Sequence, residues 1–209
     1  MYEEIREVYD AFATYPKPQV LEACDHCWSE THKQDLLSCR LEELTPEQLR
    51  KYAFDAFFTI GDVADFKYFL PRIFEITVSD DAWYVDPEVV LAKLQLAEWS
   101  NWPQNERVAV ESLLNKKFAT LIKDPDAEGP DIDKWICALG RCVADISPYL
   151  ELLLKEASEK KLLSFMEWNQ TALTEGKLAN AFWDSSANER RLLDWIKSQP
   201  VKASLKENY

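Results

Sequence analysis

Glycine is scarce in this chain, with only four residues among 209. Tight β-hairpin turns and phosphate-binding loops need glycine, because it adopts positive φ angles at no steric cost. Its scarcity argues against a sheet protein and against a glycine-rich nucleotide site. The sequence also lacks a Gly-x-Ser-x-Gly nucleophile elbow. We therefore expect an all-α protein, and the sequence gives little support for an enzyme.

Long apolar runs are missing as well. None approaches the about 20 residues that span a bilayer, and the acidic start Met1-Tyr2-Glu3-Glu4 does not resemble a signal peptide. The cysteines number five, and three of them cluster between residues 19 and 40, which argues against a disulfide framework. These features predict a cytoplasmic protein.

Basic side chains are outnumbered, with 24 Lys and Arg against 37 Asp and Glu. The first hundred residues contain 20 acidic and 9 basic side chains and so hold −11 of the net charge of −13. A field of that sign repels nucleic acid and anionic membranes and steers basic proteins. We expect a basic protein as the partner, and neither nucleic acid nor membrane. An acidic surface kept for solubility is the alternative.

The stretch from Leu41 to Ile76 carries start and stop signals for two consecutive helices. Thr45 is a favoured N-cap with Pro46 at the first helical position, and Gly61 is a typical stop. Pro71 predicts a kink or restart inside the second helix. Such signals and apolar residues at helical spacing predict helices over 2–12, 46–58, 62–79, 87–97, 103–123, 131–146 and 186–197, and one long or two short helices over 147–176.

Helix starts at Pro46, Pro87 and Asp131 lie about 40–45 residues apart, a period that suits a HEAT- or armadillo-like α-solenoid of antiparallel helix pairs. The repeats share little sequence, so an irregular helical bundle is the alternative. We expect one helical domain over residues 1–198, with an irregular Cys/His segment at 19–40, and a flexible tail over 199–209. The sequence does not indicate the oligomeric state.

Four residues of the irregular segment have the chemistry of a zinc site. Cys24, Cys27 and His32 match the spacing of the first three ligands of a zinc knuckle, and Cys39 would be the fourth. Small buried thiols and loop histidines are the alternative reading. A redox role for the Cys-x2-Cys pair is a third, but such pairs usually lie at a helix N-terminus in a βαβ unit, which this sequence does not predict.

Carboxylates and aromatic side chains follow one another near the second helix of the pair. Paired carboxylates can act as acid and base, but N-capping already explains two of them, and no histidine lies near in sequence. Aromatic residues beside carboxylates are typical of a hot spot for a basic protein surface, although packing between helix pairs is the interpretation that we favour for any single tryptophan. The partner-binding residues that we predict are Asp62, Asp65, Asp80, Asp81, Trp83 and Tyr84.

The same stretch resembles a family of uncharacterised bacterial proteins. The shared pattern is a Leu-x-Glu-Leu start, a Tyr-Ala in the first helix and then Gly-Asp-x-x-Asp-Phe-Lys/Arg-x-Phe-Leu-Pro-Arg. Its residues here are Leu41, Glu43, Leu44, Tyr52, Ala53, Gly61, Asp62, Asp65, Phe66, Lys67, Phe69, Leu70, Pro71 and Arg72. Members often carry a cysteine-containing segment upstream, which Cys24 to Cys27 resembles. The resemblance covers about a sixth of the chain and implies a bacterial cytoplasmic origin, with no activity attached.

The sequence therefore predicts an acidic helical protein-interaction module, such as an inhibitor or immunity-type protein that binds a basic partner. The alternative is a zinc-binding structural or regulatory module built on Cys24, Cys27, His32 and Cys39. An enzyme that uses Asp62 and Asp65 ranks last, and we assign no catalytic residue.

Overall fold

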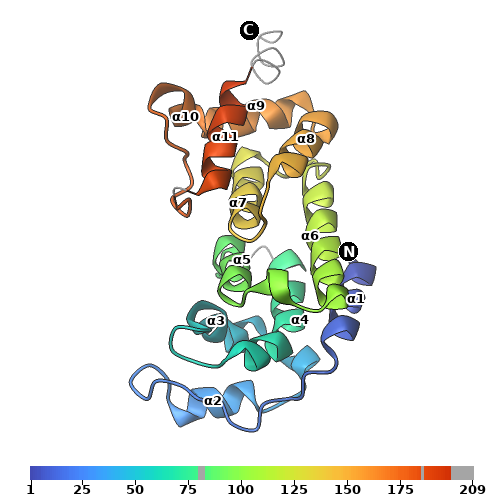
Figure 1. Cartoon of the computed structure of the whole chain (residues 1–209), viewed down its shortest axis with the longest axis vertical. Helices are drawn as coiled ribbons and strands as arrows, with labels where there is room; N and C mark the ends of the chain where they lie inside the picture. The colour runs from blue at the N-terminus through green and yellow to red at the C-terminus, as the bar shows by residue number, and fades with distance from the viewer. Residues whose placement is uncertain (80–82, 185, 199–209) are drawn as a thin grey trace. The chain divides into compact units, whose positions relative to one another are not determined.

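The computed structural model describes residues 1–79, 83–184 and 186–198. Within these ranges the backbone forms eleven α-helices, two short 3₁₀ helices and no strand (Figure 1), so the all-α prediction is confirmed. None of the described helices is both long and apolar enough to cross a membrane. The predicted tail over 199–209 lies outside the described residues.

The chain divides into two compact units, an N-terminal unit (Met1–Leu114) and a C-terminal unit (Asn115–Tyr209), with the boundary inside α6. The N-terminal unit contains α1 (Tyr2–Phe12), α2 (Glu30–Leu36), η1 (Leu41–Glu43), α3 (Pro46–Asp55), α4 (Val63–Ser79), α5 (Pro87–Leu96), η2 (Trp99–Asn101) and the first part of α6 (Gln104–Leu121). The C-terminal unit contains the rest of α6, α7 (Gly129–Gly140), α8 (Ser147–Glu156), α9 (Glu159–Trp168), α10 (Gln170–Thr174) and α11 (Ala187–Lys197). The single domain over 1–198 stays a prediction.

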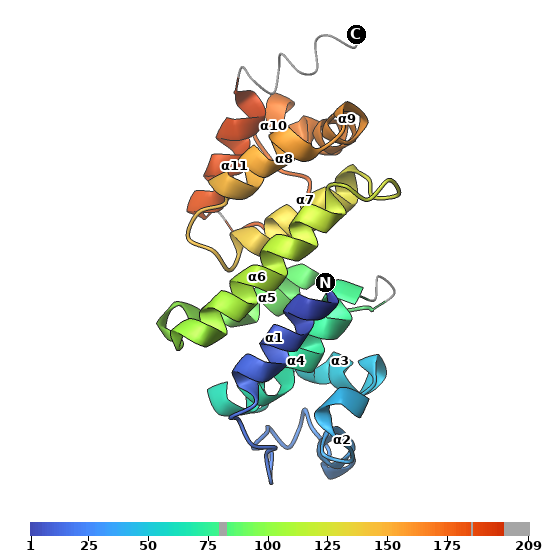
Figure 2. The same cartoon turned by 90° about the vertical axis from the view of Figure 1, so that its right-hand side faces the viewer.

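Helix α4 is the centre of the N-terminal unit. Its apolar residues are buried on most of its circumference, and it contacts α1, α3, α5 and η1. Its most extensive packing is against α1, which lies alongside it in Figure 2. In a solenoid each helix pair packs on the next pair along the chain. Helix α1 packs on α4 although α2 and α3 lie between them in the sequence. The unit therefore has irregular helical packing, which was the alternative to a solenoid.

The helix starts of the N-terminal unit follow the predicted capping signals. The Thr45 hydroxyl accepts from the backbone N–H of Gln48, and the Gln48 side chain accepts from the N–H of Thr45 at 2.9 Å, so α3 begins with a reciprocal capping box. Helix α3 ends three residues earlier than predicted, because the chain turns at Phe57 with φ +68°. Helix α4 continues through Pro71 without the predicted restart.

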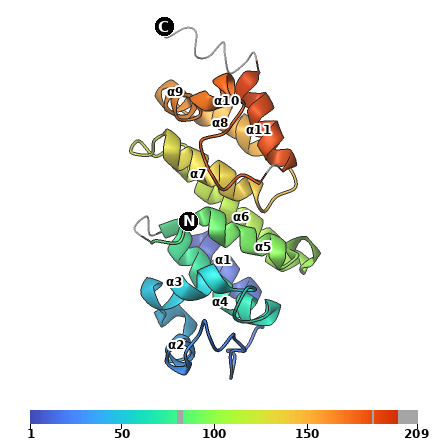
Figure 3. The same ribbon diagram turned by 90° about the vertical axis from the view of Figure 1, so that its left-hand side faces the viewer.

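The C-terminal unit is organised around the packing of α7 on α9, and Figure 3 shows α10 beside α11. Helix α7 begins at Gly129, two residues before the predicted start, with Asp131 accepting from the Glu128 N–H at 2.9 Å. The helix or helix pair expected over 147–176 is divided into three. Ser158 caps α9, and the buried Asn169 separates α9 from α10.

Candidate functional site

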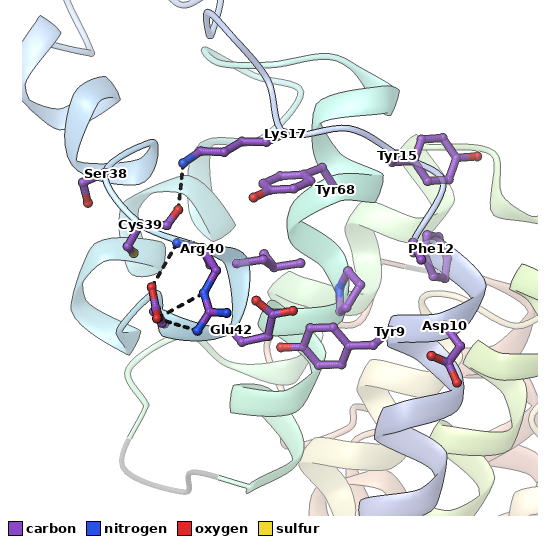
Figure 4. Close-up of a pocket in the computed structure, with 14 residues that line it drawn as sticks. Tyr9, Asp10, Phe12, Tyr15, Lys17, Ser38, Cys39, Arg40, Glu42 and Tyr68 are labelled. Atoms are coloured by element: carbon purple, nitrogen blue, oxygen red, sulfur yellow. Dashed lines mark hydrogen bonds and ion pairs between the residues drawn. The ribbon is translucent and has the colours of Figure 1, made fainter.

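An open cleft of about 820 Å³ lies in the N-terminal unit (Figure 4). Its walls come from α1 and the loop that follows it, from the segment that leads into η1, and from α4. Residues from stretches that are far apart in sequence therefore meet there. The lining residues are Tyr9, Asp10, Phe12, Ala13, Tyr15, Lys17, Ser38, Cys39, Arg40, Leu41, Glu42, Glu43, Tyr68 and Pro71. We call it the Glu42 cleft.

Tyr9 is held in place by groups behind the cleft wall. Its hydroxyl donates to Glu75 Oε2 at 2.7 Å, and Arg72 Nη1 pairs with the same oxygen at 2.7 Å. The Nε of Arg72 donates in turn to the Leu44 carbonyl at 2.8 Å. Burial first, and then the bond to Glu75, raises the pKa of Tyr9 well above its usual value. The Tyr9 ring is therefore held in the wall of the cleft, with its hydroxyl un-ionised.

Tyr15 is fixed by a buried ion pair. Its hydroxyl donates to Glu106 Oε1 at 2.7 Å and accepts from Lys67 Nζ at 2.8 Å. Lys67 and Glu106 are both buried and pair at 2.7 Å, with the ammonium 4.4 Å from the centroid of the Trp102 ring. Burial is the largest effect on Tyr15 and raises its pKa. Two aromatic side chains of the cleft are thus anchored by polar networks.

The cleft's own cations already have partners. Lys17 Nζ donates to the carbonyls of Leu37 and Cys39, each at 2.7 Å. Arg40 donates to Glu43 through Nε at 3.2 Å and through Nη2 at 2.8 Å, which raises the pKa of the Arg40 guanidinium. Glu43 is therefore the main partner of the Arg40 guanidinium, and Glu42 adds a weaker, longer-range attraction to it.

Glu42 and Tyr68 are the groups that the cleft leaves available. Within the described part of the chain, neither the Glu42 carboxylate nor the Tyr68 hydroxyl has a hydrogen-bond or ion-pair partner. Burial first, and then Glu42, raises the pKa of Tyr68, and Glu42 also contributes to the raised pKa of Tyr9. In Figure 4 Glu42 extends from η1 toward Tyr9. A carboxylate beside tyrosine rings is an arrangement that binds cations.

Two of the predicted partner-binding carboxylates are engaged with the backbone. Asp62 Oδ1 accepts from the N–H of Ala64 at 2.8 Å and of Asp65 at 3.0 Å, and Asp65 Oδ2 accepts from the N–H of Asp62 at 3.2 Å. Burial raises the pKa of Asp65, whose side chain lies near the buried Tyr52. Both acids therefore serve the start of α4, and a role in partner binding stays a prediction.

The other predicted partner-binding residues differ in exposure. Trp83 is buried and its indole donates to the Pro46 carbonyl at 3.2 Å. Tyr84 is 79% exposed, and the Arg50 guanidinium lies 5.4 Å from its ring centroid. Asp80 and Asp81 lie outside the described residues. Tyr84 is thus an exposed ring suited to contact, whereas Trp83 supports the packing of α3.

The predicted zinc ligands are only partly brought together. The thiols of Cys24 and Cys27 are exposed, and the two residues share a turn in which the Cys27 N–H donates to the Cys24 carbonyl at 2.9 Å. His32 lies in α2, a helix within the segment expected to be irregular, and its Nδ1 lies 3.0 Å from the hydroxyl of the N-cap Ser29. Cys39 lines the Glu42 cleft instead. No three Cys, His, Asp or Glu side chains of the described ranges are grouped to hold a metal ion. The zinc site stays a prediction.

Sequence reasoning did not select the residues of the cleft. Tyr9 and Phe12 belong to the apolar stripe of α1, and such a stripe does not distinguish a cleft wall from a core. No local sequence pattern predicts that Tyr68 and Glu42 line the same cleft, because their positions depend on the loop after α1 and on the turn before η1.

No family model, no curated protein and no solved structure matches this chain. The resemblance to a bacterial family through residues 41–76 therefore stays a hypothesis.

Proposed function

We propose that this protein is an acidic binding module whose Glu42 cleft receives a lysine or arginine side chain of a basic partner protein. The observation that carries the proposal is the Glu42 carboxylate, which has no hydrogen-bond or ion-pair partner within the described residues and lines the same cleft as Tyr9 and Tyr68. An inhibitor or immunity-type role against a cationic protein is one form of this function.

The charge of the N-terminal unit supports the same partner. Residues 1–114 contain 22 acidic and 10 basic side chains, and so carry −12 of the chain's −13. A field of this size accelerates the encounter with a cationic surface and weakens as salt screens it. The cleft lies in this unit, so long-range attraction and local contact favour the same kind of ligand.

The electrostatic field of the N-terminal unit and the contacts inside the cleft contribute differently to binding. A cation over an exposed aromatic ring contributes about 0.5–1 kcal/mol, and an exposed ion pair contributes about 0.2–1 kcal/mol. One side chain in the cleft therefore gives modest affinity and selects position. Most of the binding rate comes from the field of the whole unit.

Two labelled peptides of equal length test the proposal, one with arginine alternating with serine and the other with glutamine in place of every arginine. We expect saturable binding of the arginine peptide alone, weakening as salt rises. The Tyr68→Leu variant keeps the apolar contact and loses the π face, so its affinity should fall by about two- to five-fold. Equal binding of both peptides, or binding indifferent to Tyr68→Leu, would contradict the cleft as the cation site.

A further inference from the structure

The segment Cys24–Cys27, which we call the cysteine turn, has the geometry of a closed dithiol. The N–H of Cys27 donates to the Cys24 carbonyl at 2.9 Å, and that of Trp28 donates to the same oxygen at 3.0 Å. The first bond closes a four-residue turn, in which the two Cα atoms lie within about 7 Å. Disulfides span Cα separations of about 4.4–6.8 Å. Both thiols are exposed, so a small-molecule disulfide can reach them.

The cysteine turn is fastened to the body of the N-terminal unit on both sides. The N–H of Cys24 donates to the Thr59 carbonyl at 2.8 Å, and the N–H of Gly61 donates to the Glu22 carbonyl at 2.9 Å. On the far side the buried Trp28 donates its indole N–H to the Thr59 hydroxyl at 3.1 Å. The thiols are thus presented by a held turn, as a reactive pair requires.

We propose that Cys24 and Cys27 form a redox-active dithiol that exchanges with small-molecule disulfides. In the first step one of the two cysteines attacks, as its thiolate, one sulfur of the small disulfide, a mixed disulfide forms, and one thiolate leaves. In the second step the other cysteine loses its proton and attacks the protein sulfur of the mixed disulfide. The intramolecular disulfide forms, and the second thiolate leaves. The protein loses two electrons and two protons, and the small disulfide becomes two thiols.

The other cysteines do not compete for this role. Cys137 and Cys142 are buried, and burial raises the pKa of the Cys142 thiol. Cys39 is half-buried in the wall of the Glu42 cleft. A Cys39→Ser background therefore isolates the cysteine turn without touching it.

The test is reaction of the full chain, in the Cys39→Ser background, with glutathione disulfide at pH 7, followed by intact mass and peptide mapping. We expect the protein to lose two hydrogen atoms in mass without keeping glutathione, with the bond mapped to Cys24–Cys27. Cys24→Ser and Cys27→Ser should each keep one glutathione on the cysteine that remains, because the second thiol that would release it is missing.

Three outcomes would overturn the proposal. They are a parent protein that does not react, a parent protein that keeps glutathione while both thiols are present, and a bond mapped elsewhere. Circular dichroism of each variant establishes that it is folded. The test involves no basic peptide, so its result is independent of the proposed binding function.

Discussion

Lys67 and Glu106 form a buried ion pair that also positions Tyr15 in the cleft wall. Removing one partner of such a pair leaves a buried charge without its counter-charge. We therefore expect Glu106→Gln to lower the free energy of unfolding by about 3 kcal/mol, measured by urea denaturation. A loss below about 1 kcal/mol would mean that the Lys67 ammonium is solvated in the folded protein.

A double variant serves as the control for that prediction. Replacing a buried pair by apolar groups of similar size is often close to neutral, since both desolvation costs disappear together. Lys67→Met combined with Glu106→Leu should therefore recover stability to within about 1 kcal/mol of the parent. If the double variant is as unstable as Glu106→Gln, packing rather than charge explains the loss.

Tyr9 should make the free energy of unfolding decrease at alkaline pH. Burial and the bond to Glu75 raise its pKa above 10.0, the value of a free tyrosine, so the folded protein keeps the proton that the unfolded chain releases. The stabilisation is complete below pH 10 and is lost as the pH rises further. Between about pH 10 and 11 the free energy of unfolding should fall more steeply in the parent than in Tyr9→Phe, by up to about 1.4 kcal/mol per pH unit.

A matched control for Tyr9→Phe is Tyr2→Phe, which removes a hydroxyl from the same helix at a residue that is 78% exposed. Its alkaline profile should follow that of the parent. Identical slopes for the parent and Tyr9→Phe would show that Glu75 does not hold the tyrosine proton.

At the scale of elements, Gly129 sets how closely α7 approaches α9. A Cβ at this position would lie within 2.6 Å of the Phe165 backbone nitrogen and closer still to the Ser164 carbonyl group. Backbone atoms of a packed helix cannot yield as a flexible side chain can. We expect Gly129→Ala to lower the free energy of unfolding by about 2–3 kcal/mol, measured by denaturant titration.

Gly176→Ala is the comparison for this substitution. Gly176 has φ +70°, and no atom of the described residues lies within 4 Å of an added Cβ. Alanine there should therefore lower the free energy of unfolding only through backbone strain, by about 1 kcal/mol. Equal costs at the two positions would refute the close approach of α7 and α9.

Elements with explicit capping signals were predictable from sequence, and elements ended by tertiary contacts were not. Helix α3 begins at the predicted Pro46 after its Thr45 cap, and α1, which has no side-chain cap, matches the range predicted from its apolar spacing. The stretch 147–176 was expected to contain one or two helices and contains three. The break at Asn169 depends on its side chain, which donates to Asp133 Oδ1 at 2.8 Å and accepts from the Ala179 N–H at 3.2 Å. Hydrogen bonds between residues so far apart in sequence do not change the hydrophobic periodicity, so the sequence pattern could not predict this break.

At the scale of the whole molecule, composition predicted the charge of the surface but not the place where a partner binds. The acidic N-terminal half and the all-α class follow from residue counts. The Glu42 cleft depends on how α1, η1 and α4 meet, and no local pattern marks Glu42 or Tyr68. The predicted Asp62 and Asp65 are capping residues in the structure, because a carboxylate at a helix start meets free N–H groups first.

The central claim is that the cleft, and not the acidic surface in general, selects a cation. Glu42→Gln and Glu47→Gln test it most directly, because both remove one negative charge from exposed glutamates of the same unit, and only Glu42 lines the cleft. Titration with the arginine peptide at fixed ionic strength should show an affinity about five-fold lower for Glu42→Gln and nearly unchanged for Glu47→Gln. Equal losses in the two variants would contradict the account and leave only a diffuse electrostatic attraction.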